Sequence, residues 1–338
     1  MSELPRPLLD GLGAGGELDR AALVAHAHAA IERGSRSFGL ASRLFDRPTR
    51  ERVWLLYAWC RRCDDLADAQ DHGGRLGARN DAQQRLATIR ERTALALAGR
   101  AAGDPAFDGL GVVAGETGLT AAMAGDVIAG FALDAADWQP RSEADLLRYC
   151  FHVAGAVGVM MAVVMGVPAG DEATLDRACD LGIAFQLANI ARDLEEDDAA
   201  MRCYLPHDWL AEADIPPGEH LKPHYRAALL PLVERLCALA HAHECSGRIG
   251  AGRLGFRQRW AVLAAAGIYG AIATQVERRG ARAWDHRTVV SDSAKLGWIA
   301  RAGWQALRPP SRACREGAEA RRWTRRELAR RELARRAI

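Results

Sequence analysis

The sequence predicts an all-α protein built as a single domain. Three observations support this fold class. Apolar residues recur at helical spacing along most of the 338 residues, no segment shows the sustained alternation of a strand, and only 13 prolines interrupt the chain. No linker divides the body. We therefore expect a flexible leader over residues 1–18, a helical domain over 19–307 and a basic tail over 308–338.

The first five helices follow from their start and stop signals. Residues 19–33 form the first helix, and Pro48 opens a second that runs to about residue 71. The sequence Asp71-His72-Gly73-Gly74 then ends this helix. Further helices are expected over 81–99, 105–115 and 119–132.

The second half of the chain continues in the same way. Helices are expected over 143–166, 171–198, 206–213, 224–247, 258–279 and 290–307. The run from Tyr149 to Gly170 is uncharged and long enough for a membrane span. A buried core helix is the better interpretation, because no other segment offers a convincing partner span.

Charge is distributed unevenly. The net charge is +2, but the tail from Arg308 onward holds eleven Arg and four Glu, which leaves −5 for the rest. We expect either a solvated basic tail or a tail that contacts anionic lipid head groups on the inner face of the membrane. The acidic body and the absence of a known binding module argue against nucleic acid as a partner.

The cysteines and the leader indicate a cytoplasmic protein. Eight cysteines show no disulfide framework, and the pair Cys60 and Cys63 has no second pair with which to hold zinc. The leader lacks the cationic start and apolar run of a signal peptide. Gly11, Gly13 and Gly16 match a dinucleotide-binding spacing, but no strand precedes them.

Polar side chains line one face of the second helix. Tyr57, Arg61, Asp64 and Asp68 are spaced by four, three and four residues, so they form a single stripe on an α-helix.

A second stripe lies over a hundred residues later, where Gln186, Asn189, Asp193 and Asp197 are spaced by three, four and four. The surrounding helix is apolar, so these groups need cations if they are buried.

Carboxylate and amide oxygens on two helices suit a hard cation such as Mg²⁺. The neighbouring Arg61 and Arg192 suit a diphosphate that would be shared with the metal. The alternative for each stripe alone is a solvated acidic face supported by pairs at i and i+4.

Four blocks of sequence resemble the squalene and phytoene synthases, most closely the bacterial phytoene synthases. They are Gly34 to Phe38, Tyr57 to Asp68, Tyr149 to Gly158, and Gln186 to Pro206. The resemblance runs from about residue 25 to 300 and implies an isoprenoid synthase helical bundle around a central apolar cavity.

The resemblance also implies roles for individual residues. Asp64, Asp68, Asp193 and Asp197 would form two metal-binding motifs, and Asn189 would add a ligand. The prenyl diphosphates would be contacted by Ser35, Arg36, Ser37, Tyr57, Arg61, Gln186, Arg192, Arg202 and Tyr269. Gly155 and Gly158 would permit close approach of substrate or of a neighbouring helix. Met201 departs from the family, which usually has glycine there.

The activity implied is a head-to-head condensation of two geranylgeranyl diphosphates to phytoene in carotenoid biosynthesis. The intermediate would be a cyclopropyl (prephytoene) diphosphate, and Mg²⁺, or Mn²⁺ in its place, would assist ionisation. The alternatives are a squalene or dehydrosqualene synthase acting on farnesyl diphosphate, and a non-enzymatic assembly factor on the same fold. No NADPH is expected, because the dinucleotide motif lacks its context.

Two helices are expected to supply the apolar lining of the cavity. The candidates are Met160, Met161, Val164, Met165, Ala264, Ala265 and Ile268, of which some would face the core instead.

Overall fold

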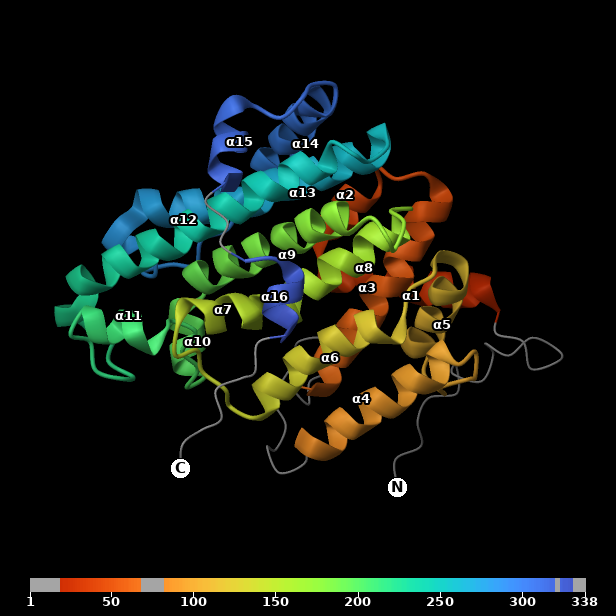
Figure 1. The fold of residues 1–338 in the computed structure, drawn as a ribbon, viewed down its shortest axis with the longest axis horizontal. Helices are drawn as coiled ribbons and strands as arrows, with labels where there is room; N and C mark the ends of the chain where they lie inside the picture. The colour runs from red at the N-terminus through yellow and green to blue at the C-terminus, as the bar shows by residue number, and fades with distance from the viewer. Residues whose placement is uncertain (1–18, 68–81, 320–322, 331–338) are drawn as a thin grey trace.

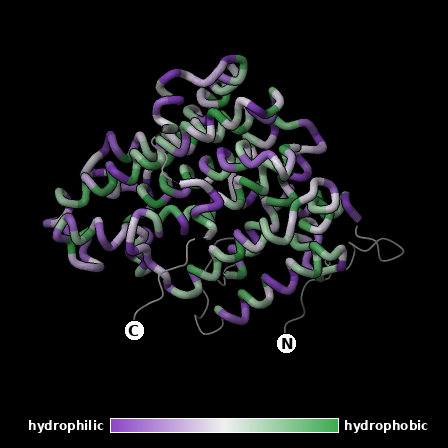
Figure 2. Tube along the Cα trace, in the orientation of Figure 1, coloured by the Kyte–Doolittle hydropathy of each residue, from purple (hydrophilic) through white to green (hydrophobic). Residues whose placement is uncertain are grey.

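The computed structural model describes residues 19–67, 82–319 and 323–330, and within these ranges it contains helices and no strand. The all-α prediction is confirmed. The helices form one body around a central cavity, and α14 and α4 lie at opposite ends of it (Figure 1). Hydrophobic and hydrophilic residues alternate along the individual helices, as amphipathic packing requires (Figure 2).

The five N-terminal helices pack against one another, and the second and third of them line the cavity. They are α1 (Arg20–Gly34), α2 (Arg36–Ser42), α3 (Arg47–Ala67), α4 (Ala82–Leu97) and α5 (Pro105–Thr117). Helix α2 was not predicted, although Ser35 is a clear N-cap whose Oγ accepts from the Phe38 N–H at 3.2 Å. The expected end of the second helix near residue 71 lies outside the described residues.

Another side of the cavity is lined by one helix and by a following helix that a π-helical turn interrupts. Helix α6 (Ala121–Ala135) is followed by α7 (Glu143–Cys150), a π-helical turn η3 (Phe151–Gly155) and α8 (Ala156–Val164). Residues Glu143–Val164 are long and apolar enough to cross a membrane, but 67% of that window is buried in the protein. This segment is the core helix that its composition favours.

Helix α9 (Glu172–Arg192) lies at the centre and packs against α8, α12 (Arg226–Ala251) and α13 (Phe256–Arg279). Glycines make the α8–α9 contact possible. A Cβ on Gly158 would lie 2.4 Å from the Ala178 carbonyl oxygen, and one on Gly182 would lie 2.3 Å from that of Ala154. The close-packing interpretation of Gly158 is therefore correct, and the same holds for Gly155 against Cys179.

One predicted helix is divided in two. The expected helix over 171–198 ends at Arg192, and α10 (Leu194–Ala199) begins after Asp193. The Ala191 carbonyl accepts a hydrogen bond from Trp284 Nε1 at 3.0 Å, so a distant side chain takes an acceptor of the last helical turn. The remaining elements of this region are α11 (His207–Glu212), η4 (Pro223–Tyr225), η5 (Gly280–Arg282) and α14 (Asp292–Ala306).

The basic tail is not wholly solvated. It contains α15 (Arg312–Glu319) and α16 (Arg325–Arg330). Leu328 is 1% exposed, and Arg325 pairs with Glu172 and with Asp176, the latter at 3.2 Å. The solvated-tail interpretation is wrong for this segment, because a local repeat cannot reveal acidic partners on α9.

All eight cysteines are free thiols. Cys60 and Cys63 lie in α3, and burial raises the pKa of Cys60 to about 12 and that of Cys63 well above its usual value. Burial thus favours the protonated thiol at both positions near neutral pH.

Candidate active site

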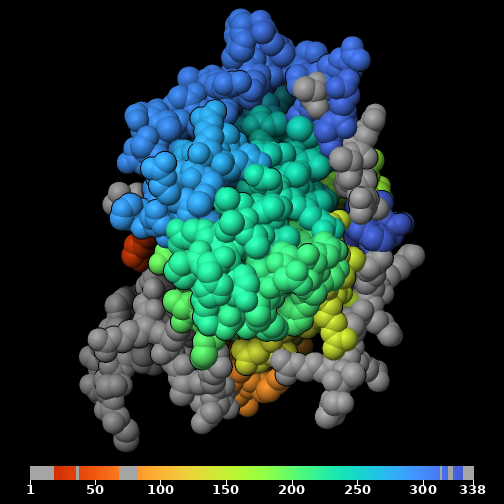
Figure 3. All heavy atoms as spheres, turned by 90° about the vertical axis from the view of Figure 1, so that its left-hand side faces the viewer, coloured from red at the N-terminus to blue at the C-terminus, as the bar shows by residue number. Residues whose placement is uncertain are grey.

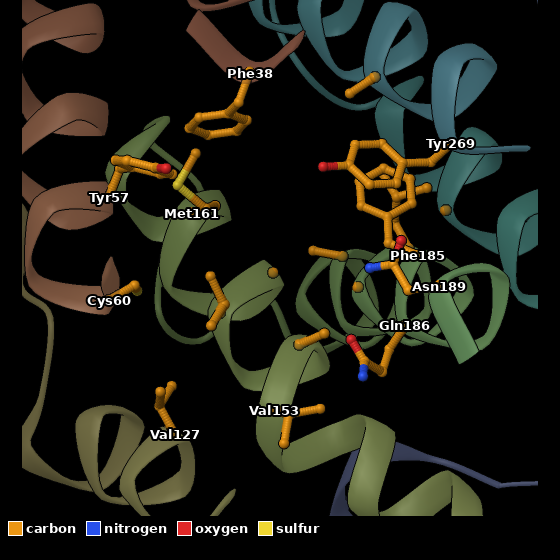
Figure 4. Close-up of a pocket in the computed structure, with 18 of the residues that line it drawn as sticks. Phe38, Tyr57, Cys60, Val127, Val153, Met161, Phe185, Gln186, Asn189 and Tyr269 are labelled. Carbon is orange, nitrogen blue, oxygen red and sulfur yellow. The ribbon is translucent and has the colours of Figure 1, made fainter. Parts of the chain in front are cut away.

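A cavity of about 650 Å³ lies between α2, α3, α6, α8, α9 and α13. This volume falls within the range of about 300–1,000 Å³ that is usual for small-molecule sites. Polar side chains from α3 and α9 line it together with many apolar side chains, and Figure 4 shows Tyr57 of α3 and Gln186 and Asn189 of α9 on opposite walls. The predicted residues that line it are Ser35, Tyr57, Arg61, Asp64, Gln186, Asn189, Asp193, Asp197, Arg202 and Tyr269.

The first stripe is held by ion pairs within α3. Arg61 Nη1 lies 3.1 Å from Asp64 Oδ2, and Arg61 Nη2 lies 2.8 Å from Asp65 Oδ1. Asp65 is buried, whereas half of the Asp64 side chain is exposed. Asp64 can therefore exchange its contact with Arg61 for a metal while Arg61 keeps a partner. Asp68 lies outside the described residues.

Tyr57 is the first residue of this stripe, and its side chain faces the cavity (Figure 4). Its ring stacks on Phe38 with centroids 5.6 Å apart, and burial raises the pKa of its phenol to about 12. Gly34 leaves room for it, because a Cβ there would lie 2.3 Å from the Tyr57 hydroxyl. Tyr57 is thus a neutral hydrogen-bond donor at the cavity wall.

The second stripe occupies the end of α9. Gln186 and Asn189 point into the cavity (Figure 4), and Asn189 Oδ1 is buried without a hydrogen-bond partner in the described residues. Asp193 ends the helix and accepts from Arg192 Nε at 2.6 Å. Arg192 therefore reaches the site by holding Asp193, and it is not itself part of the cavity lining.

Asp197 follows on α10 and is placed by the same break. Burial, and then the charge of Asp193, raises the pKa of Asp197 to about 7. The Asp197 backbone N–H donates to the Asp193 backbone carbonyl at 2.8 Å, so the backbones of the two residues are tied together across the break. The carboxyl group of Asp197 lacks enough positive charge around it.

These features fit a metal ion. No group of three or more His, Cys, Asp or Glu side chains is gathered for one in residues 19–67, 82–319 and 323–330. Two observations nevertheless favour a cation: the orphaned oxygen of Asn189 and the poorly compensated charge of Asp197. The donors are all oxygens, which is the chemistry of a hard divalent ion.

The other predicted diphosphate contacts are dispersed. Tyr269 stacks on Phe185 at 4.2 Å on the far wall, and Arg202 lines the cavity beside Asp197. Ser35 lines it too, while its Oγ caps α2. The side chains of Arg36 and Ser37 lie outside what the structure describes, so their roles stay predictions.

The structure adds groups that the sequence did not reveal. Arg287 Nε lies 3.1 Å from Asp193 Oδ1, although 94 residues separate them, and no local pattern could have found it. Tyr149 donates to Asp134 Oδ1 at 3.0 Å and stacks on Tyr204 at 4.8 Å. Tyr149 and Tyr204 belong to two of the blocks noted above, which was the available signal.

The predicted apolar lining divides between the cavity and the core. Met161, Met165 and Ala265 line the cavity. The other candidates face the buried core, as was expected for some of them: Met160, Val164, Ala264 and Ile268.

Met201 adopts a positive φ of 59° and is 77% exposed, close to the site. This left-handed conformation suits glycine, which explains the family preference at that position.

Comparison with known proteins identifies the chain. The squalene/phytoene synthase family model matches residues 31–294. The chain belongs to this family. A phytoene synthase from Pseudescherichia vulneris is 44% identical over 85% of this chain and 93% of that protein. A 15-cis-phytoene synthase from Pantoea ananas is 42% identical over 88% and 96%, respectively.

The fold agrees with this squalene/phytoene synthase assignment. A solved dehydrosqualene synthase in complex with ligand superposes with a TM-score of 0.76 at 26% identity, covering 85% of this chain and 98% of that one. The protein is therefore a prenyltransferase-type enzyme of a generally metal-dependent family.

Proposed function

We propose that this squalene/phytoene synthase joins two geranylgeranyl diphosphates head to head to form phytoene through a cyclopropyl (prephytoene) diphosphate. The observation that carries the proposal is one continuous cavity lined by carboxylates, an amide and guanidinium groups together with many apolar side chains. The names of the relatives, phytoene synthase and 15-cis-phytoene synthase, support the product.

The polar region would bind and ionise the diphosphates. Mg²⁺, or Mn²⁺ in its place, would be held by Asp64, Asn189, Asp193 and Asp197, with Asp68 expected beside Asp64. Bound there, the metal supplies Lewis-acid neutralisation of the leaving diphosphate. Arg61 and Arg202 add positive charge on the cavity side, and the neutral Tyr57 phenol donates a hydrogen bond.

The apolar walls would protect the carbocation formed when diphosphate leaves. Phe38, Phe185 and the ring of Tyr269 present aromatic carbon surfaces to it (Figure 4). Exclusion of water favours carbon–carbon bond formation over hydrolysis. Aromatic faces also stabilise positive charge close to them.

Three alternatives are separated by chemistry. Squalene formation needs a reductant, and we expect no NADPH. Dehydrosqualene formation would use farnesyl diphosphate in the same site. A non-enzymatic assembly factor has no need of two acidic stripes, and Asp64, Asp193 and Asp197 all face this cavity.

Location follows from the substrate and the charge distribution. We infer a cytoplasmic protein that contacts the inner face of the membrane through its basic tail, where Arg attracts anionic head groups. Nucleic acid is not expected as a partner.

Incubation of the purified protein with Mg²⁺ and either farnesyl or geranylgeranyl diphosphate tests the proposal. Identification of phytoene from geranylgeranyl diphosphate, at the higher kcat/KM, is expected. A preference for farnesyl diphosphate would overturn the product assignment and leave the family unchanged.

A further inference from the structure

Exposed apolar side chains gather on one part of the surface. Among the described residues, six large hydrophobic side chains are exposed, and three of them lie on or directly after α14: Leu296 at 60%, Trp304 at 58% and Leu307 at 69%. A fourth, Phe256, begins α13, the helix that α14 packs against. Scattered exposed hydrophobics need no explanation, but a cluster marks an interaction surface.

Helix geometry holds these side chains outward. Leu296, Trp304 and Leu307 are spaced by eight and three residues and so share one face of α14. Ala302 and Ala306 are buried on the other face against α13. Trp260 Nε1 donates to the Ile299 carbonyl at 2.8 Å, which fixes the rotation of the helix.

Arginines flank the same surface. The Arg308 guanidinium lies 3.9 Å from the Trp304 ring centroid, and that of Arg301 lies 5.3 Å from the Trp298 ring. Arg315 is exposed nearby, and Arg312 is exposed although it pairs with Glu316. Tryptophan beside arginine is the combination that settles at the head-group level of a bilayer.

The surface also lies behind a wall of the cavity. Val262 and Ala265 of α13 line the cavity, whereas Leu263 and Ala264 of the same helix pack in the cluster with α14. One helix thus separates α14 from the space proposed for prenyl chains. Helices α14 and α15, blue in Figure 3, cover the upper end of the molecule.

We propose that the exposed face of α14, with Trp304 and Leu307 at its centre and Arg301 and Arg308 beside them, docks on an anionic lipid bilayer. The partner is a membrane surface, because the patch combines exposed apolar side chains with arginines, which complement an anionic head-group layer. The proposal deepens the inner-membrane location proposed above and places the contact on the body of the enzyme as well as on its tail. Apolar insertion and head-group attraction would act together.

Co-flotation with phosphatidylcholine vesicles, with and without phosphatidylglycerol, tests this surface. Trp304→Ser with Leu307→Ser should weaken binding about tenfold or more, because the inserted apolar area is lost. Arg301→Gln with Arg308→Gln should weaken binding to the anionic vesicles by about thirtyfold, from the attraction of each arginine near the membrane. Activity in solution should be unchanged in both.

A matched control removes two exposed arginines from the opposite end of the molecule. Arg90 lies in α4 and Arg100 just beyond it, and both are exposed (Figure 1). Arg90→Gln with Arg100→Gln should leave vesicle binding within about twofold, since the arginines face away from the membrane and are screened. An equal loss of vesicle binding in this control would show that net charge alone drives binding, and it would overturn the proposal.

Two further measurements separate the other occupants. Replacing the tail residues Arg331, Arg335 and Arg336 with Gln should leave apolar insertion intact. If this tail variant lost all vesicle binding while the α14 variants lost none, the contact would lie on the tail alone and the proposal would be overturned. Light scattering should show the same oligomeric state for the protein and its Trp304→Ser/Leu307→Ser variant. A dimer that this variant dissociates would make the face a contact between copies and overturn the proposal.

Discussion

The two acidic stripes carry the same chemistry in different surroundings. Asp64 lies on the unbroken helix α3, is half exposed, and pairs with Arg61 one turn away. Asp193 lies where α9 ends, its side chain is 18% exposed, and it pairs with Arg192 and Arg287. The first stripe is therefore organised within its own helix, whereas the second is held by the adjacent Arg192 and also by a residue 94 positions away.

This difference teaches which half of the site depends on the fold. Arg61 keeps its ion pair with Asp65 when Asp64 is replaced, so loss of the Asp64 carboxylate should change the free energy of unfolding little. Arg192 has a side chain only 16% exposed, and Asp193 is its described partner. Removal of Asp193 leaves a poorly solvated charge behind. The second stripe should thus link activity to stability, and the first should not.

Metal removal has the largest expected effect and treats both stripes alike. Excess chelator should abolish turnover, because the leaving diphosphate loses its Lewis acid, and Mg²⁺ should restore it. Product formation before and after metal addition is the measurement. Full turnover in metal-free buffer would contradict a shared metal site.

Replacing one carboxylate in each stripe tests directly whether the two stripes differ in their contribution to stability. Asp64→Asn and Asp193→Asn should each lower kcat/KM by about 10²–10³-fold, the effect of removing one preorganised charged group. Only Asp193→Asn should also lower the free energy of unfolding, by about 1–3 kcal/mol, because Arg192 loses its partner. Denaturant titration of the two metal-free variants measures this difference. Equal stability would show that the two stripes are held alike.

A change at the apolar wall leaves both stripes intact. Ala265→Phe should lower kcat/KM for geranylgeranyl diphosphate several-fold more than for farnesyl diphosphate. The phenyl ring would occupy part of the cavity that the longer prenyl chain needs.

The adjacent Ala264→Phe is the matched control. Ala264 is fully buried in the α13–α14 cluster, so this change should destabilise the protein by about 1–3 kcal/mol with no switch in chain-length preference. An equal loss for both substrates in Ala265→Phe would show that position 265 does not limit chain length.

The smallest expected effect tests the long-range partner of the second stripe. The Arg287 side chain is half exposed, so Arg287→Gln should change kcat/KM by less than about tenfold and stability by less than about 1 kcal/mol. Higher salt should shrink the difference from the parent enzyme, because salt screens exposed pairs. A loss as large as that of Asp193→Asn would make Arg287 essential to the stripe.

The sequence by itself determined most of the helices, both polar stripes and the family. These features are local: a period of 3.6 residues places Tyr57, Arg61 and Asp64 on one face whatever the surrounding fold, and the same holds from Gln186 to Asn189. The N-cap Ser35 was also a local signal, although α2 itself was not predicted.

Only the tertiary structure decided the rest. Trp284 ends α9 before Asp193, Arg287 reaches Asp193 from a distant loop, and α13 turns Ala265 toward the cavity but Ala264 toward α14. The tail likewise docks because Arg325 finds carboxylates on α9. Each of these depends on a contact between segments far apart in the chain or on the rotation of one helix against its neighbours. The local periodicity of a sequence fixes which residues share a face, but packing energy decides where that face points.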